Sequence, residues 1–366
     1  MCQENIDFVV IGAGVTGLSV ARELALAGHQ VVILEKNTKW GQGVSGRNSE
    51  VLHAGIYYPP ESLKARLCVA GNSLLREYLQ QRGIPLSGLG KLIVGWEPWH
   101  VDALEKIVAN AKNNGVPLTT LAPREVRELE PNIHVSAALF SPTSAVFDVA
   151  TYLHSLYREM ENAGGMGFMN VEVTGLTPSH GAWEITGREG TDEFALRAGV
   201  VINCVGLYAD AIASMAGVPI YEKHLNLHFC KGDYFSITPQ KARLVSRPVY
   251  PLPEIDNLGI HITPDFCGSV KLGPDAYYID KTEEYSVDPQ KAEVFYQAVK
   301  PFFLPLEPED ILPAMSGIRP KLQENGGPFK DFHIKQDLPG LYSLIGIESP
   351  SLTSSLAIAR HLHSLL

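Results

Sequence analysis

The chain opens with two apolar runs separated by a glycine-rich turn. Residues 8–11 (FVVI) read as a buried strand, and GAGVTG follows at residues 12–17. Helical spacing covers residues 18–27, and a second apolar run at 31–34 ends at Glu35. This order predicts a strand–helix–strand unit with parallel strands.

The glycines of this turn carry a specific spacing. Gly12 permits a tight turn, Gly14 lets a pyrophosphate approach the backbone, and Gly17 lets the helix pack closely on the strand. The start of the helix offers unpaired N–H groups to phosphate. Glu35, 18 residues after Gly17, is expected to accept hydrogen bonds from ribose hydroxyls. The unit therefore predicts dinucleotide binding.

The rest of the chain predicts further helices and strands, followed by a region of alternating strands. Further helices are expected at residues 63–81, 101–113, 123–129, 148–163 and 353–365. Strands are expected at residues 171–175, 183–186, 199–206 and 341–346. From about residue 225 alternation replaces helical spacing, and it predicts strands at 228–237, 249–252, 258–263 and 269–272, with a hairpin at 264–268.

These patterns predict an α/β fold, α+β overall, with an antiparallel sheet domain inserted into a Rossmann-like one. The cofactor domain is expected to comprise residues 1–84, 145–224 and 315–366. The substrate domain is expected to comprise residues 85–144 and 225–314.

Composition narrows the class of protein. The net charge of -10 argues against nucleic-acid partners, which need a basic face. Five cysteines without a Cys-x-x-Cys motif make a disulfide framework or structural zinc unexpected and favour buried, reduced thiols of a cytoplasmic protein. No run of about 18 apolar residues occurs, so no transmembrane helix is expected. Peripheral contact with the inner face of a membrane stays open.

Three polar or small-residue segments carry a family resemblance. They are SGRNSEVLHAG at residues 45–55, NCVGLYAD at 203–210 and GIESPSLT at 346–353. Together with the dinucleotide unit they resemble the D-amino-acid-oxidase-like FAD-dependent oxidoreductases. The resemblance implies the glutathione-reductase-like FAD fold of D-amino-acid-oxidase type.

Other blocks are most similar to the branch of this family that oxidises L-2-hydroxyglutarate. They are HAGIYY at residues 53–58, SLKA at 62–65, GIHIT at 259–263 with Gly273-Pro274, and SGIRPK at 316–321. The chain departs from that branch at Arg47, where histidine or another polar residue is expected, and at Glu50, where glycine is expected.

The resemblance implies non-covalent FAD; a covalent link through His53 is the weaker alternative. Residues 45–49 are expected to follow the ribityl chain to the flavin edge, and Val173 to contact adenine through its backbone. The start of the last helix is expected to face flavin N1–C2=O. The expected cofactor residues are Gly12, Gly14, Val15, Thr16, Glu35, Lys36, Ser45, Arg47, Asn48, Ser49, His53, Val173, Cys204, Gly206, Arg319, Gly346, Glu348, Ser349, Pro350, Leu352 and Thr353.

Oxidation of a 2-hydroxy acid requires a cation for the carboxylate and a base for the hydroxyl proton. Arg319 is the candidate cation, since a guanidinium binds a carboxylate bidentately. His261 is the first candidate base: alternation places it on a polar face with Gly259 and Thr263, which suggests a wet pocket. His53 is the second candidate.

Tyr250 and Tyr234, on strands expected to be neighbours, are candidate hydrogen-bond donors to substrate, with packing roles equally open. Lys231-Gly232 is a candidate for closure over the site. His224 and His228 suit a metal only on a helix; their segment alternates like a strand, so no metal is expected.

Three alternatives stay open. The first is an amine or amino-acid oxidase on the same scaffold, which often needs no side-chain base. The second is a flavin-binding assembly protein that catalyses no reaction. The third is an NAD-dependent dehydrogenase. The electron acceptor of the preferred reading is expected to be oxygen, a quinone or another carrier.

Overall fold

The computed structural model describes residues 6–253, 259–280 and 283–366, which form two compact units. Unit 1 comprises Met1–Gly46, Val149–Phe229 and Arg319–Leu366; unit 2 comprises Arg47–Asp148 and Cys230–Ile318. Residues 47–84, expected in the cofactor domain, thus fall in unit 2. The reason is local pairing, since β3 (Val51–Leu52) pairs with β8 (Ala145–Phe147), which also pairs with β4 (Leu86–Ser87).

Unit 1 is built on one mixed sheet. Five strands run parallel in the order β20 (Leu341–Ile345), β12 (Asp192–Asn203), β1 (Ile6–Ile11), β2 (Val31–Glu35) and β9 (Met166–Met169). Three strands join antiparallel: β10 (Val171–Ser179) on β11 (Ala182–Glu189), β11 on β12, and β19 (His333–Leu338) on β20. The unit's helices are α1 (Val15–Leu26), α5 (Val149–Asn162), α6 (Ala209–Met215) and α9 (Ser351–His363).

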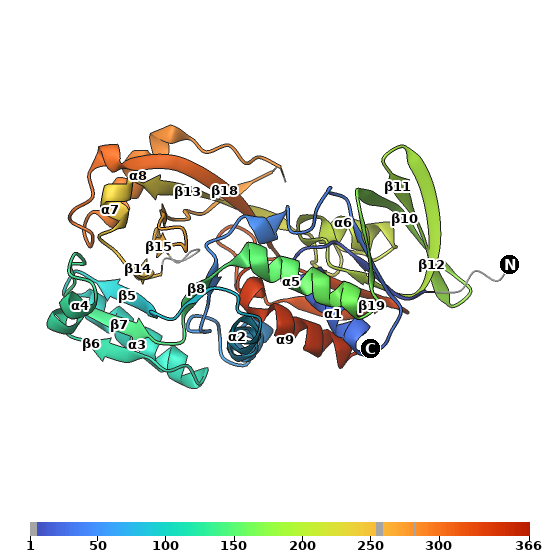
Figure 1. Cartoon of the computed structure of the whole chain (residues 1–366), viewed down its shortest axis with the longest axis horizontal. Coiled ribbons are helices and arrows are strands. Elements are labelled where there is room, and N and C mark those ends of the chain that lie inside the picture. Colours follow the sequence, from blue (N-terminus) through green and yellow to red (C-terminus); the bar gives the residue numbers. More distant parts are fainter. Residues whose placement is uncertain (1–5, 254–258, 281–282) are drawn as a thin grey trace. The chain divides into compact units, whose positions relative to one another are not determined.

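Helix α1 packs against both α5 and α9, as Figure 1 shows. Strands β2 and β20 and most of β1 are buried on both faces, which explains why the sequence reads as unbroken apolar runs there. Val9, Ile11, Val32 and Leu34 are each at most 4% exposed and share one core cluster. This packing holds the turn between β1 and α1 at the end of the sheet.

Unit 2 contains a nine-stranded sheet. Its order is β17 (Tyr277–Ile279), β13 (His228–Ile237), β16 (Val270–Leu272), β15 (Ile262–Pro264), β14 (Val249–Tyr250), β5 (Lys91–Gly95), β7 (Ala137–Ser141) and β6 (Thr119–Leu121), with β18 (Ile311–Lys321) pairing β13. The helices outside unit 1 are α2 (Leu63–Gln81), α3 (His100–Asn113), α4 (Pro123–Leu129), α7 (Pro239–Ala242) and α8 (Ala292–Val299). Short 3-10 turns occur at Val44–Gly46, Gly206–Tyr208, Pro289–Lys291 and Pro308–Asp310.

The strand register of this sheet places apolar residues on one face and mainly polar residues on the other. Val249 lies opposite both Leu92 and Ile262, while Leu272 lies opposite both Ile262 and Phe235. All five are buried in one apolar core cluster. Because side chains alternate along a strand, the neighbouring residues point to the other face. That second face, here called the polar face, carries Lys91, Tyr234, Tyr250, His261 and Thr263.

Several sequence expectations change in detail. The strand expected at 258–263 is β15, which begins only at Ile262, and Leu258 lies outside the described residues. The strand expected at 249–252 ends at Tyr250. β16 and β15 separate the strands of Tyr234 and Tyr250, so these strands are not neighbours. The hairpin at 264–268 is confirmed by antiparallel pairing of β15 with β16.

The cysteines divide by exposure. Cys68, Cys204 and Cys230 are buried free thiols, as expected, whereas Cys267 is an exposed free thiol on the hairpin. Within the described ranges, no helix combines the length and apolar character needed to cross a bilayer.

Candidate active site

The glycine-rich turn of unit 1 leaves no room for side chains. Gly12 has φ +97°, and a Cβ there would lie 2.7 Å from the Cys204 carbonyl oxygen. A Cβ on Gly17 would lie 1.9 Å from the Gly12 oxygen. Only glycine satisfies both positions, since L side chains rarely adopt such φ and the approach is to backbone. The turn therefore has the close packing that a dinucleotide-binding loop requires.

Two side chains hold this turn in place. Glu35 is buried, accepts a hydrogen bond from the Ala13 N–H at 2.8 Å, and accepts another from the Asn37 N–H at 2.9 Å. The Ser45 hydroxyl accepts from the Val15 N–H at 2.9 Å. Ser45 thus lies at the start of α1, where the segment expected to follow the cofactor begins.

The start of α1 suits a phosphate group. Gly14, its N-cap residue, supplies no side-chain hydrogen bond, and no acidic residue occupies the first turn. The backbone N–H groups and the positive end of a 12-residue helix therefore face their ligand without a competing carboxylate in that turn. Val15 and Thr16 begin this helix, and both are buried.

The remaining candidate cofactor residues of unit 1 lie at strand and helix ends. Cys204 and Gly206 follow β12, and the Cys204 N–H donates to Ile11 O at 2.9 Å. Val173 is 7% exposed in the same core cluster as Ile11 and Leu34. Lys36 places its ammonium 3.9 Å from the Tyr208 ring centroid. Gly346, Glu348, Ser349, Pro350, Leu352 and Thr353 form the turn into α9 and its first residues.

The segment after Ser45 belongs to unit 2. The Arg47 guanidinium lies 4.1 Å from the Tyr285 ring centroid and donates to Ser316 O at 3.5 Å. The Asn48 side chain accepts from the Glu50 N–H at 2.8 Å. Ser49 shares a 3.0 Å hydrogen bond with the Tyr234 hydroxyl. These contacts tie the segment to β18 and β13.

Glu50 explains one departure from the family pattern. Its φ is +59°, a conformation that favours glycine, which is the residue expected there. The Glu50 carboxylate pairs with the Lys271 ammonium at 3.0 Å. The chain therefore has a positive φ at a residue other than glycine, and an ion pair holds its side chain.

The polar face of unit 2 brings together two of the candidate catalytic residues, Tyr250 and His261. The Tyr250 and His261 rings stack, with centroids 3.8 Å apart and an interplanar angle of 15°. The pKa of Tyr250 is raised well above its ordinary value, first by burial and then by Tyr57 and Tyr234 nearby. His261 is buried, precedes β15 and packs against an aromatic ring. The wet pocket expected beside it stays a prediction.

The hydrogen bond of His261 decides its tautomer. Nδ1 lies 3.0 Å from Gly259 O, and a carbonyl oxygen can only accept. Nδ1 therefore carries the hydrogen, so in the neutral form of the ring the lone pair is on Nε2. This nitrogen can take a proton.

His53 is a neutral group in this structure. Burial, and then the charge of Lys91, lower the pKa of His53 to about 3. Its carbonyl oxygen accepts from the Asn72 side chain of α2 at 2.8 Å, and Asn72 also donates to Thr143 O. His53 is thereby fixed by α2 in unit 2, and a neutral imidazole there can donate or accept hydrogen bonds.

Sequence reasoning missed two residues of this cluster, Lys91 and Tyr57. The Lys91 ammonium lies 4.2 Å from the Tyr250 ring centroid and 5.1 Å from that of Tyr57. Burial lowers the pKa of Lys91 to about 7. The signal for finding Lys91 was present in the sequence: a lysine directly before the apolar run LIV, in a strand buried throughout.

Two other candidates have different surroundings from those expected. Lys231 is buried, donates to Ser286 O at 2.5 Å and lies 3.8 Å from Asp233, so it is fixed in a charged network. Closure over the site by Lys231 is therefore wrong. Arg319 is half-buried near the end of β18, in the part of that strand assigned to unit 1.

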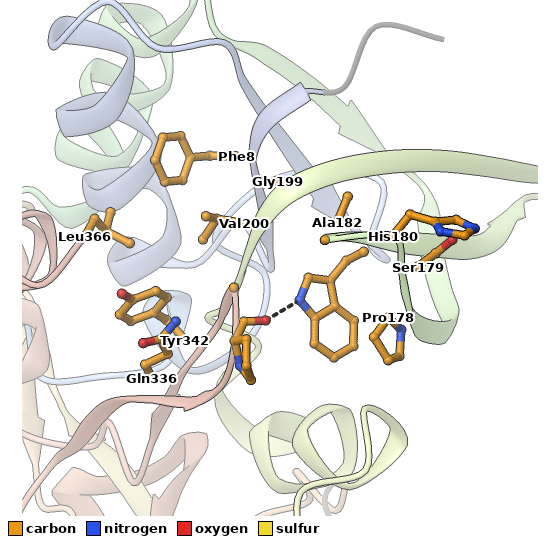
Figure 2. A pocket seen from close by; sticks show the side chains of 14 residues that line it. Phe8, Pro178, Ser179, His180, Ala182, Gly199, Val200, Gln336, Tyr342 and Leu366 are labelled. Atoms are coloured by element: carbon orange, nitrogen blue, oxygen red, sulfur yellow. Dashed lines mark hydrogen bonds between the residues drawn. The ribbon is translucent and has the colours of Figure 1, made fainter. Parts of the chain in front are cut away.

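A hollow in unit 1 is separate from these residues. It has a volume of about 560 Å³ and is lined by β10–β12 residues together with Phe8, Tyr342 and Leu366 (Figure 2). Trp183 on its wall donates from Nε1 to Pro339 O at 3.0 Å. It contains none of the candidate site residues, so we assign it no part in the chemistry.

Comparison with known proteins agrees with the family resemblance seen in the sequence. The family model described as FAD dependent oxidoreductase matches residues 7–365. A mitochondrial L-2-hydroxyglutarate dehydrogenase of Arabidopsis thaliana is 36% identical, covering 99% of this chain and 83% of the plant protein. The L-2-hydroxyglutarate dehydrogenase of Escherichia coli (strain K12) is 32% identical, covering 76% of this chain and 66% of that protein.

A solved structure shares the fold over the whole chain. The L-α-glycerophosphate oxidase of Mycoplasma pneumoniae, with FAD bound, superposes with a TM-score of 0.89 at 24% identity, covering 100% of this chain and 95% of its own. The predicted fold class is confirmed by this likeness. Because the family model spans nearly the entire chain, and because the glycine turn has the packing that a dinucleotide needs, the chain belongs to the family of FAD-dependent oxidoreductases.

Proposed function

We propose that this oxidoreductase converts L-2-hydroxyglutarate to 2-oxoglutarate. The observation that carries the proposal is His261, a buried histidine whose Nδ1 faces Gly259 O and whose ring stacks on Tyr250. An alcohol substrate needs a proton acceptor, and a neutral imidazole is suited to that role. The names of the plant and bacterial relatives support the choice of substrate.

The proposed roles follow from the residues. Gly12, Gly14, Glu35, Ser45 and the start of α1 hold the pyrophosphate and ribose of FAD, as their packing and hydrogen bonds support. The bound cofactor supplies a hydride acceptor at flavin N5 for the hydrogen on C2.

The proton is handled by the polar face. His261 Nε2 takes the hydroxyl proton of the substrate as the hydride leaves C2, so the alcohol becomes a ketone. Stacking on Tyr250 restricts the imidazole to one orientation. Arg319 is the proposed partner of the substrate carboxylate next to C2, because a guanidinium binds a carboxylate bidentately.

The cofactor must then be reoxidised. We propose oxygen, a quinone or another carrier as acceptor, within a cytoplasmic protein that can contact a membrane surface. Non-covalent binding of FAD, and no metal, complete the proposal.

Anaerobic flavin bleaching tests this function. The purified protein is mixed with L- and D-2-hydroxy acids, amino acids and glycerol 3-phosphate. Loss of the oxidised flavin absorbance is expected with L-2-hydroxyglutarate. Bleaching by amino acids alone would replace the proposal with an amine oxidase, and no bleaching by any compound would favour a flavin-binding assembly protein.

Two variants test the assigned roles. H261Q is expected to lower the rate of flavin reduction roughly 10²- to 10⁴-fold while FAD stays bound. H134Q, at an exposed histidine of unit 2, is the matched control. R319A is expected to keep FAD and raise KM; loss of FAD from R319A would instead assign Arg319 to the cofactor or to folding.

A further inference from the structure

Lys91 is a buried cation in an unusual setting. It begins β5, is 1% exposed, and lies on the polar face with Tyr250 and His261. In the part of the chain that the structure describes, its ammonium contacts only the rings of Tyr57 and Tyr250 and makes no ion pair with a carboxylate. A buried charge without a partner is costly, so its retention needs an explanation.

Three other buried or half-buried cations of unit 2, Arg247, Lys231 and Lys291, have carboxylate partners. Arg247 pairs with Glu130 at 3.0 Å, and Lys231 lies 3.8 Å from Asp233. Lys291 pairs with Asp233 at 2.7 Å and with Asp275 at 2.9 Å. Unit 2 therefore places an acid beside each of these three cations, and Lys91 differs from them.

A second polar atom beside Lys91 also lacks a partner. The Tyr57 hydroxyl oxygen is buried, and no residue in the described ranges hydrogen-bonds to it. Buried hydroxyls are nearly always hydrogen-bonded in folded proteins. An ammonium and a hydroxyl donor, both unsatisfied and close together, make a site for an anion with oxygen acceptors.

The chemistry of the anion follows from the neighbours. His53 is neutral and contributes no competing positive charge. Lys91 and His261 both contact the Tyr250 ring, at 4.2 and 3.8 Å from its centroid, so they lie within about 8 Å of each other. The hydroxyl and the far carboxylate of a five-carbon 2-hydroxy dicarboxylate fall within the same upper limit.

We propose that Lys91, assisted by the Tyr57 hydroxyl, binds the carboxylate at the far end of the substrate and so makes the enzyme selective for dicarboxylic 2-hydroxy acids. This inference rests on the proposed function and names its specificity. Binding of the carboxylate supplies the negative charge that the protein itself does not place beside Lys91. Lys91 is a binding residue in this scheme, and the proton still passes to His261.

The test compares two substrates that differ at one end. L-2-hydroxyglutarate and L-2-hydroxypentanoate have the same length, with a carboxylate in one where the other has a methyl group. K91M is expected to raise the KM for L-2-hydroxyglutarate roughly 10- to 100-fold, the range for a hydrogen bond to a charged group. The KM for L-2-hydroxypentanoate should change less than about threefold, because that substrate never uses the ammonium.

K106M, at an exposed lysine of α3, is the matched control and should change neither KM. Equal increases in KM for both substrates with K91M would overturn the proposal. A fall in kcat for both substrates with unchanged KM would instead assign Lys91 to the reacting end.

A binding experiment with unaltered protein decides the question without a variant. Glutarate and pentanoate are titrated into the oxidised holoenzyme, and the flavin spectrum is followed. Glutarate is expected to bind at least tenfold more tightly than pentanoate, and equal affinities would overturn the proposal. If no 2-hydroxy acid bleaches the flavin, the proposed function fails, while the glutarate comparison still decides whether this is a dicarboxylate site.

Discussion

Unit 2 contains two buried charged groups with different surroundings: the network around Asp233, and Lys91. Asp233 is fully buried and receives Lys291 at 2.7 Å and the Tyr277 hydroxyl at 3.0 Å, while Lys231 lies 3.8 Å away. Every charge of this network has an opposite charge within the protein. Lys91 has aromatic rings in place of an acid. The first arrangement stabilises the fold, whereas the second costs stability and is explained by binding.

The network also orders a segment that supports the cofactor loop. Lys231 donates to Ser286 O, and Ser316 donates its hydroxyl to Tyr285 O at 2.8 Å. The Tyr285 ring stacks on the Arg47 guanidinium. Charges paired for structure are thereby linked through this segment to Arg47.

The largest expected effect is removal of the shared acid. D233A leaves Lys231 and Lys291 without their common carboxylate in a buried setting, so the free energy of unfolding should fall by about 3–5 kcal/mol. Urea unfolding followed by circular dichroism measures it. A loss below about 1 kcal/mol would mean that Asp275 and Glu284 can neutralise the two lysines alone.

Replacement of Lys91 should change the free energy of unfolding in the opposite direction and make the protein more stable. Burial lowers its pKa from 10.5 to about 7, which at about 1.4 kcal/mol per pH unit corresponds to a cost on the order of 4 kcal/mol at neutral pH. K91M removes that cost with little change in volume, and the free energy of unfolding should rise by roughly 2–3 kcal/mol. Urea unfolding followed by circular dichroism measures this change. A lower free energy of unfolding in K91M would contradict the view that Lys91 costs stability.

The stability difference between K91M and the parent protein should depend on pH. Between pH 7 and 10.5 the folded protein has released the Lys91 proton and the unfolded chain still holds it. The unfolded state then binds more protons, so the stability of the parent rises with pH in this window. The advantage of K91M should therefore narrow from pH 7 to pH 10 and stay constant below pH 7. A pH-independent difference would show that charge burial is not the cause.

The smallest effect is expected at an exposed pair. Arg124 and Glu128 lie 3.4 Å apart on α4, with side chains 89% and 65% exposed. E128Q should change the free energy of unfolding by less than about 0.5 kcal/mol, because water screens such pairs. Urea unfolding of E128Q, measured alongside D233A and K91M, serves as the reference for the two larger effects. A decrease in the free energy of unfolding close to that of D233A would remove the distinction between buried and exposed pairs.

Much of unit 1 could be predicted from the sequence because its signals are local. The turn at Gly12 and Gly17 requires glycine for contacts within a few residues or with one neighbouring strand, and Glu35 follows at a fixed spacing. Helices with clear apolar spacing, such as Leu63–Gln81, have the predicted bounds. By contrast, β5 and β7 are five-residue strands without an alternating pattern, because both faces are buried, and they were not predicted.

The sequence by itself determined the cofactor class, since the glycine turn, the acid after β2 and the polar segment at Ser45 each carry their chemistry in order along the chain. It also singled out His261, but within a strand that in the structure begins only at Ile262. Only the tertiary structure brought Lys91 beside Tyr57 and Tyr250, over distances of 34 and 159 residues in the chain. The physical reason is that sheet register and packing, and no local pattern, decide which buried charges meet an acid and which do not.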